Sequence, residues 1–99
     1  MAEVIWSPQA KADLHEIAEY ISGDSVHYAE ATVSRIIASV ERLKKFPSSG
    51  RIVPELGMLA IREVVLGNYR IVYRLSKMYC EVVTVLHSRQ DLLKHLSKK

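Results

Sequence analysis

The sequence predicts an α+β fold in which an antiparallel sheet packs on a helical hairpin. Apolar residues follow a helical period in the first half of the chain and a period of two in the second half. Tight-turn signals separate three consecutive strand-like segments in the second half, which favours an antiparallel meander. The 99 residues show no linker or internal repeat, so we expect a single domain over residues 1–99.

The chain begins with a strand followed by a helix. Glu3–Trp6 is a short apolar run, expected at an edge of the sheet or beside the last strand. Ser7 can cap a helix and Pro8 suits its first position, whereas Gly23 is a plausible end. The apolar stripe of this helix contains Ala10, Leu14, Ile17, Ala18 and Ile21.

A second amphipathic helix follows almost directly. Asp24 or Ser25 is its predicted cap, and Pro47 ends it. Its apolar stripe contains Ala29, Val33, Ile36, Ile37, Val40 and Leu43. Because the link between the two helices is so short, we expect an antiparallel helical hairpin that covers one face of the sheet.

The first two strands of the meander form a hairpin. A loop over residues 48–57 leads to a predicted strand over 59–66. Gly67 and Asn68 both tolerate positive φ and form a two-residue turn signal. Tyr69–Leu75 then alternates as the next strand.

A third strand and a short helix complete the predicted order β-α-α-β-β-β-α. Residues 76–78 turn the chain into Tyr79–His87, which is the most apolar strand. Ser88 and Asp91 have the spacing of a capping box, so we expect a last helix that starts there and runs through Leu96.

Composition excludes several classes of protein. The chain contains one cysteine, which rules out an internal disulfide framework. Its apolar runs are too short to span a membrane, and its first residues lack the features of a signal peptide. These observations favour a small cytoplasmic domain that makes no membrane contact.

The net charge of +3 is unevenly distributed. Residues 1–50 contain five basic and seven acidic side chains, whereas residues 51–99 contain nine basic and four acidic ones. Arginine, which binds phosphate and carboxylate through two parallel hydrogen bonds, supplies much of the excess. A polyanionic or acidic partner and a merely solvated basic face are both consistent with this pattern.

The sequence lacks the usual catalytic and cofactor motifs. It has no glycine-rich phosphate loop, no nucleophile elbow and no histidine pair at metal-ligand spacing. We therefore expect neither a metal nor a cofactor.

Arginines are the remaining candidates for chemistry. Arg70 and Arg74 alternate onto one face of their strand, and Arg89 follows the neighbouring strand. Such a cluster would stabilise charge in phosphodiester cleavage, or it would dock an acidic protein segment. Cross-strand ion pairs with Glu63 or Glu81 are the purely structural alternative.

Four segments resemble the RelE/ParE superfamily of toxins from bacterial type II toxin–antitoxin operons. Two of them are REVVLGNYRIVYR at 62–74 and VLHSRQDL at 85–92. The others are the WSP start at 6–8 and the joint at 46–51. The resemblance covers nearly the whole chain in the element order given above, and its last segment is more similar to the ParE branch.

The RelE branch implies a ribosome-dependent endoribonuclease that is independent of metal. On that pattern Arg70 and Arg89 match catalytic arginines, and His95 lies near the position of a C-terminal tyrosine. His87 or His95 would then act as acid or base. Glu63 lies where the nuclease branch is basic, and a carboxylate there would repel the scissile phosphate.

The ParE branch implies inhibition of DNA gyrase and neutralisation by a cognate antitoxin. We favour this function, with the ribosome and messenger RNA as the alternative target. The antitoxin is expected to bind between the helical hairpin and the sheet edge, with arginines meeting its carboxylates. The implied partner-binding residues are Arg62, Arg70, Arg74, Arg89, Leu14, Ile17 and Ile21. A stand-alone RNA-binding module is a rival function from another class.

Overall fold

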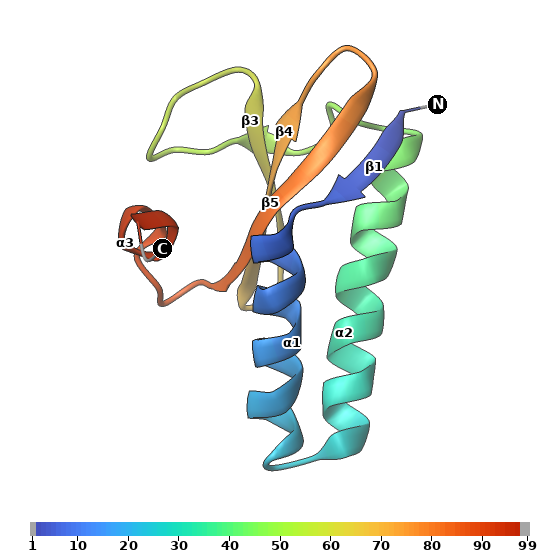
Figure 1. Cartoon of the computed structure of the whole chain (residues 1–99), viewed down its shortest axis with the longest axis vertical. Coiled ribbons are helices and arrows are strands. Elements are labelled where there is room, and N and C mark those ends of the chain that lie inside the picture. The colour runs from blue at the N-terminus through green and yellow to red at the C-terminus, as the bar shows by residue number, and fades with distance from the viewer. Residues whose placement is uncertain (1, 98–99) are drawn as a thin grey trace.

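The computed structural model describes residues 2–97 and has the α+β class expected from the sequence (Figure 1). Its elements are, in chain order, β1 (Glu3–Trp6), α1 (Pro8–Ser22), α2 (Val26–Glu41), the 3₁₀ turn η1 (Arg42–Lys44), β2 (Arg51–Ile52), β3 (Ile61–Leu66), β4 (Tyr69–Leu75), β5 (Tyr79–His87) and α3 (Leu92–Ser97). No helix within residues 2–97 is long and apolar enough to cross a membrane.

The five strands form one sheet in the order β1-β5-β4-β3-β2. The antiparallel meander of β3, β4 and β5 is confirmed. β1 lies at an edge beside the last strand, as expected, but it runs parallel to β5, so the sheet is mixed rather than wholly antiparallel. Parallel neighbours require a long connection, and here most of the chain lies between the two strands.

A fifth strand, β2, lies inside the segment predicted to be a loop. Arg51 pairs with Glu63 and Ile52 pairs with Arg62 on β3. Two residues are too few for an alternating pattern to be visible in the sequence. β3 itself begins at Ile61, two residues later than predicted.

Both long helices begin at serine caps. The Ser7 hydroxyl accepts a hydrogen bond from the Ala10 N–H at 3.0 Å, and the Ser25 hydroxyl accepts one from the Tyr28 N–H at 3.1 Å. Ser25 rather than Asp24 is therefore the cap of α2. The Ser7 hydroxyl also donates to the Val83 carbonyl at 2.8 Å, which ties the start of α1 to β5.

The turns near the C-terminus differ from the prediction in detail. Only Gly67 of the β3–β4 turn has positive φ, at 58°. Asp91 caps α3 by accepting a hydrogen bond from the Lys94 N–H at 3.1 Å. Ser88 does not start the helix, because its N–H is bonded to the Asn68 carbonyl at 2.7 Å.

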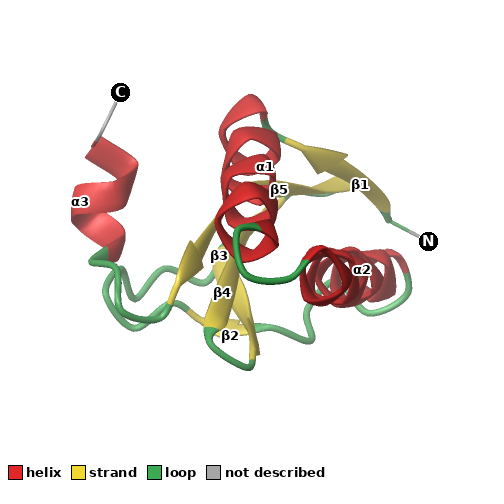
Figure 2. Cartoon of the chain, turned by 90° about the horizontal axis from the view of Figure 1, so that it is seen from below, coloured by secondary structure: helices red, strands yellow, loops and turns green. Residues whose placement is uncertain are grey.

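The sheet is covered on both faces. The helical hairpin packs on one face, where the buried residues are Ala10, Ile36, Val40, Ile71, Val82 and Val85. On the other face, α3 and the β2–β3 loop enclose Val53, Val72, Leu86 and Leu92. Figure 2 shows α3 and α2 on opposite sides of β3 and β4.

Candidate functional site

A pocket of about 530 Å³ lies between α1, the ends of β4 and β5, and the loop that leads to α3. We call it the α1–α3 pocket. Its lining residues are Asp13, Glu16, Ile17, Tyr20, Tyr69, Val85, His87, Arg89, Gln90 and His95. It combines carboxylates, imidazoles, a guanidinium and two phenols.

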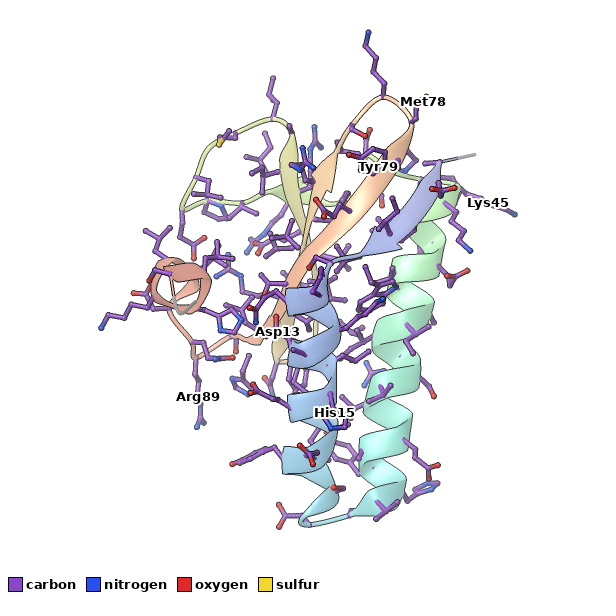
Figure 3. All side chains as sticks on the ribbon, in the orientation of Figure 1. Asp13, His15, Lys45, Met78, Tyr79 and Arg89 are labelled. Carbon is purple, nitrogen blue, oxygen red and sulfur yellow. The ribbon has the colours of Figure 1, made fainter. Side chains whose placement is uncertain are left out.

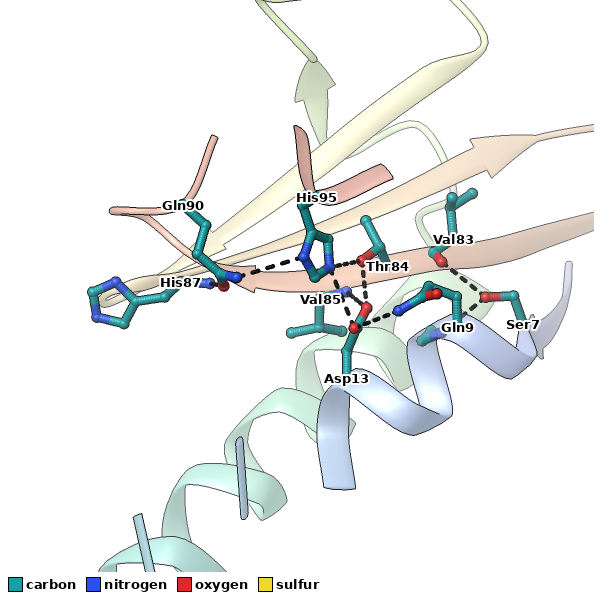
Figure 4. A network of polar contacts seen from close by, with 10 residues as sticks. Ser7, Gln9, Asp13, Val83, Thr84, Val85, His87, Gln90 and His95 are labelled. Carbon is teal, nitrogen blue, oxygen red and sulfur yellow. Dashed lines mark hydrogen bonds and ion pairs between the residues drawn. The ribbon is translucent and has the colours of Figure 1, made fainter. Parts of the chain in front are cut away.

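One lining residue is a buried carboxylate, Asp13, and Figure 4 shows its polar contacts. Asp13 is only 3% exposed. Its Oδ2 accepts hydrogen bonds from the Thr84 hydroxyl and, at 3.1 Å, from the Val85 N–H. Its Oδ1 accepts from the Gln9 amide at 2.8 Å and lies 3.2 Å from His95 Nε2. A carboxylate with this many donors is well compensated for its burial.

The network fixes the orientation of the His95 ring. The Thr84 hydroxyl proton is committed to Asp13, so the Thr84 oxygen accepts from His95 Nε2 at 2.9 Å. Nε2 therefore carries a proton, and Nδ1 faces Gln90 at 3.5 Å. An imidazole that a carboxylate orients through one ring nitrogen is an arrangement found in acid–base catalysis. The His95 side chain is only 11% exposed.

His87 and Arg89 lie at the same pocket. The His87 ring packs edge-to-face on Tyr69 with centroids 5.4 Å apart, and its Nδ1 accepts from the Arg89 N–H at 3.1 Å. Burial raises the pKa of the Tyr69 hydroxyl, which keeps that phenol protonated. The Arg89 side chain extends outward from the loop after β5 (Figure 3).

Two carboxylates bind the Arg70 guanidinium on the face of the sheet opposite to the α1–α3 pocket. We call this arrangement the Arg70 clamp. Arg70 Nε donates to Glu63 at 2.6 Å, and its Nη1 and Nη2 both donate to Glu55 at 2.7 Å. Glu63 is fully buried and also accepts from Arg51 Nε at 2.6 Å. The hydrogen bonds from Arg70 lower the pKa of Glu55 to about 2, and the same bonds raise the pKa of Arg70.

Arg74 and Arg62 are also engaged, at separate places. Arg74 pairs with Glu81 across the strands at 3.0 Å. Arg62 donates to the carbonyls of Leu59, Ser48 and Gly50. The alternative of cross-strand ion pairs therefore describes Arg70 and Arg74, and the structure does not gather the four arginines into one cluster.

The apolar residues expected at the partner groove are divided between two surfaces. Ile17 lines the α1–α3 pocket, and Ile21 is buried. Leu14 lines a second hollow of about 400 Å³ between α1, α2 and the end of β1, which we call the hairpin groove. Its lining residues are Trp6, Lys11, Leu14, His15, Ala18, Val33 and Ile37.

Asp13 and Thr84 are the site residues that sequence reasoning missed. Asp13 lies one position before Leu14 and three after Ala10, within the apolar stripe of α1. A carboxylate at such a position indicates a buried polar contact. Its partners are 71 and 82 residues away along the chain, which local patterns do not reveal. Among residues 2–97, no group of three metal-binding side chains is found.

Comparison with known proteins agrees with this architecture. The family model described as "ParE toxin of type II toxin-antitoxin system, parDE" matches residues 4–92. The putative toxin Y4kP of Sinorhizobium fredii is 37% identical over 88 residues, which are 87% of this chain and 88% of that protein. Toxin RelE2 of Caulobacter vibrioides is 32% identical over 89 residues, which are 89% and 97% of the two chains.

Two solved structures share the fold. A chain of the chromosomal ParDE system from P. aeruginosa superposes with a TM-score of 0.74 at 20% identity, covering 88% of this chain and 96% of that one. A chain of the RelBE2 toxin–antitoxin complex from Mycobacterium tuberculosis gives a TM-score of 0.64 at 18% identity, covering 87% and 96%.

The fold and these relatives define a toxin of the RelE/ParE superfamily from a type II toxin–antitoxin system, which confirms the resemblance. Within that superfamily, the chain belongs to the ParE toxin family.

Proposed function

We propose that this toxin inhibits DNA gyrase and that a cognate antitoxin neutralises it. The observation that carries the choice of target is the Arg70 clamp. All three guanidinium nitrogens of Arg70 donate to Glu55 and Glu63. A catalytic arginine must instead present those donors to the scissile phosphate.

Releasing Arg70 for catalysis would be costly. Glu63 is fully buried, so removing Arg70 would leave its carboxylate with Arg51 as the remaining cation. Breaking one side of a buried ion pair costs about 3–5 kcal/mol. In this proposal Arg70 supports the fold, and Arg62, Arg74 and Arg89 contribute to partner binding.

A second candidate function is favoured by the Asp13–His95 pair. An imidazole oriented by a carboxylate, beside His87 and Arg89 in the α1–α3 pocket, is suited to acid–base cleavage of RNA. The ribosome and its messenger RNA are therefore the alternative target, with His87, His95 and Arg89 in catalytic roles and Arg70 excluded by its clamp.

The target can be identified by two assays run in parallel. Brief induction in cells should leave messages intact and induce the DNA-damage response, and purified toxin should block supercoiling by gyrase with accumulation of linear plasmid. Arg89→Ala should weaken this inhibition, whereas Lys94→Ala, at an exposed position of α3, should not. Early cleavage of messages in the ribosomal A site, lost in Arg89→Ala and His95→Gln while gyrase works normally, would establish the nuclease instead.

The antitoxin is the second partner in the proposal. The similar solved structures come from toxin–antitoxin systems, and the hairpin groove fits the expected site between the helices and the sheet edge. Ala18 lies between the two helices there and allows close approach, while Trp6, Leu14 and Ile37 supply apolar contact. A flexible antitoxin segment would fold into this groove as an amphipathic helix.

Two exposed isoleucines provide a matched test of this groove. Ile37 is 41% exposed in the groove, and Ile52 is 37% exposed on β2. Co-expression with the adjacent open reading frame should rescue growth for the native chain and Ile52→Glu, but not for Ile37→Glu. Equal rescue of both variants would place the antitoxin elsewhere.

A further inference from the structure

A basic and aromatic surface lies where α2 ends and β2 begins, and neither proposed target site uses it. Two adjoining hollows, of about 520 and 380 Å³, share Arg42 as a lining residue. Arg51 and Ser49 line the first, and Lys45 and Phe46 line the second. We call these five residues the η1–β2 surface. Figure 3 shows Lys45 and Arg89 on opposite sides of the molecule, so this surface is separate from the α1–α3 pocket.

The positive charge on this surface is largely uncompensated. Glu41 is paired with Lys44 at 2.7 Å. Glu63 lies beneath the surface and is already bonded to Arg70 and Arg51. Among the ion pairs within residues 2–97, none involves Arg42 or Lys45. Both side chains are therefore available to an anion.

Arg51 is oriented toward the same hollow. Its Nε is fixed to Glu63 at 2.6 Å, while the side chain as a whole is 61% exposed. Fixing Nε limits the rotation of the guanidinium and leaves Nη1 and Nη2 as a fork for a further partner. The ion pair with Glu63 thus orients the Arg51 guanidinium and leaves Nη1 and Nη2 free to donate to a ligand.

Four hydrogen bonds hold the loop between η1 and β2 in place. The buried Tyr73 hydroxyl donates to the Pro47 carbonyl at 2.7 Å and accepts from the Gly50 N–H at 2.9 Å. Arg62 Nη1 donates to the carbonyls of Ser48 and Gly50, each at 3.2 Å. A ligand that binds a loop held in this way loses little free energy to ordering it.

The chemistry of the surface matches a nucleic-acid strand. Arginine and lysine side chains neutralise backbone phosphates, and the hydroxyl of Ser49 is an additional donor. Phe46 is 57% exposed beside these cations. An exposed aromatic ring next to a basic track is the arrangement on which unpaired bases stack.

We propose that the η1–β2 surface binds single-stranded nucleic acid, with Arg42, Lys45 and Arg51 on backbone phosphates and Phe46 stacked on a base. This inference does not depend on which target is correct, because gyrase and the ribosome both hold nucleic acid. A toxin that contacts both the target protein and its bound strand gains affinity through effective concentration.

Direct binding tests the proposal. Purified full-length toxin is titrated into fluorescein-labelled 20-nucleotide single-stranded DNA, RNA of the same sequence, and the corresponding duplex, with anisotropy as the readout. With three phosphate contacts, a plot of log affinity against log salt concentration should have a slope of about −2. DNA and RNA single strands should bind alike, since stacking and phosphate contacts are common to both.

Charge-matched variants locate the surface. Arg42→Glu combined with Lys45→Glu should weaken single-strand binding at least tenfold. Arg35→Glu combined with Lys77→Glu makes the same change in net charge at exposed positions elsewhere and should leave binding nearly unchanged. Circular dichroism and melting temperature confirm that each variant is folded.

Phe46→Ala should weaken single-strand binding about tenfold, because the exposed ring would no longer stack on a base. Duplex binding should be unaltered, because paired bases do not stack on the ring.

The proposal is overturned if no strand binds at 50 mM salt, if both double variants lose binding equally, or if Phe46→Ala has no effect. It is also overturned if the Arg42/Lys45 variant loses only antitoxin affinity, which would assign the surface to an acidic peptide. These readouts stand apart from gyrase inhibition, so failure of either proposal leaves the other measurable.

Discussion

Asp13 joins three elements through one buried side chain. It accepts hydrogen bonds from Gln9 on its own helix and from Thr84 and Val85 on β5, and it contacts His95 on α3. Alternation along the strands indicated Glu63 and Glu81 as cross-strand partners of Arg70 and Arg74, and both ion pairs form. It did not indicate Glu55, which reaches Arg70 from a loop, or the contacts of Asp13, because strand alternation says nothing about partners from other kinds of element.

Asp13→Asn should lower the free energy of unfolding by about 2 kcal/mol. The amide keeps the shape but has one acceptor oxygen, so buried donors of Thr84 or Val85 lose their partner, a loss that costs about 1–3 kcal/mol. Urea denaturation measures the change. Asp24→Asn, at an exposed position in the α1–α2 link, should stay within about 0.5 kcal/mol of the native chain. Equal stability of all three proteins would contradict the role given to Asp13.

Glu55 should make stability depend on pH in the acid range. Its pKa is about 2 in the folded protein, chiefly because Arg70 donates hydrogen bonds to it, against 4.5 as the ordinary value. The unfolded chain therefore binds the proton first as pH falls, so the stabilisation is complete above about pH 4.5 and is lost toward pH 2. Unfolding free energies measured across this range should fall less steeply for Glu55→Gln than for the native chain.

Glu30→Gln, at an exposed position on α2, serves as the control and should keep the native pH slope. If Glu55→Gln also keeps the native pH slope, folding does not lower the pKa of Glu55 as described.

At the scale of elements, hydrophobic period and turn residues predicted most of the fold. Both long helices, the β3–β4–β5 meander and a short last helix form close to where the sequence placed them. β2 and the parallel pairing of β1 with β5 were missed. The pairing of β1 depends on a strand far along the chain, whereas β2 is only two residues long and shows no period of its own.

Gly50, in the loop before β2, has no room for a side chain. A Cβ there would lie 2.7 Å from the Tyr73 ring and 2.8 Å from the Glu63 carbonyl oxygen. Gly50→Ala should therefore displace the loop and weaken both hydrogen bonds of the Tyr73 hydroxyl, which donates to Pro47 and accepts from the Gly50 N–H. The melting temperature should fall by several degrees, as about 1–3 kcal/mol of overpacking does in a domain this size. Ser49→Ala, next to it at an exposed position, should melt like the native chain, and a Gly50→Ala protein that did the same would refute this account.

At the scale of the whole molecule, charge is separated between the layers. Residues 8–41, which form the helical hairpin, carry two basic and six acidic side chains, so the basic excess lies on the sheet and its connections. The excess of acidic residues in 1–50 and of basic residues in 51–99 already indicated this separation of charge. It did not locate the η1–β2 surface, because Arg42 and Lys45 belong to the half with excess acid.

Antitoxin binding should raise the melting temperature of the toxin. A ligand that binds only the folded state at a hundred times its Kd stabilises that state by about 2.7 kcal/mol, which corresponds to a rise of about 10–20 °C in a domain of this size. Differential scanning fluorimetry with increasing antitoxin measures the shift. Ile37→Glu should show a smaller rise than Ile52→Glu at equal antitoxin concentration; the reverse order would argue against the hairpin groove.

The pairing of the first strand with the last has a consequence for synthesis. β1 leaves the ribosome early, yet its partner β5 is among the last segments to be translated. The Ser7–Val83 bond likewise waits for a residue 76 positions later. Contacts this distant in sequence form slowly, and until β5 emerges the apolar face of the helical hairpin has no sheet to cover. The sheet is therefore completed only when translation is nearly finished, and we expect an antitoxin that is already present to meet the toxin before its last strand is in place.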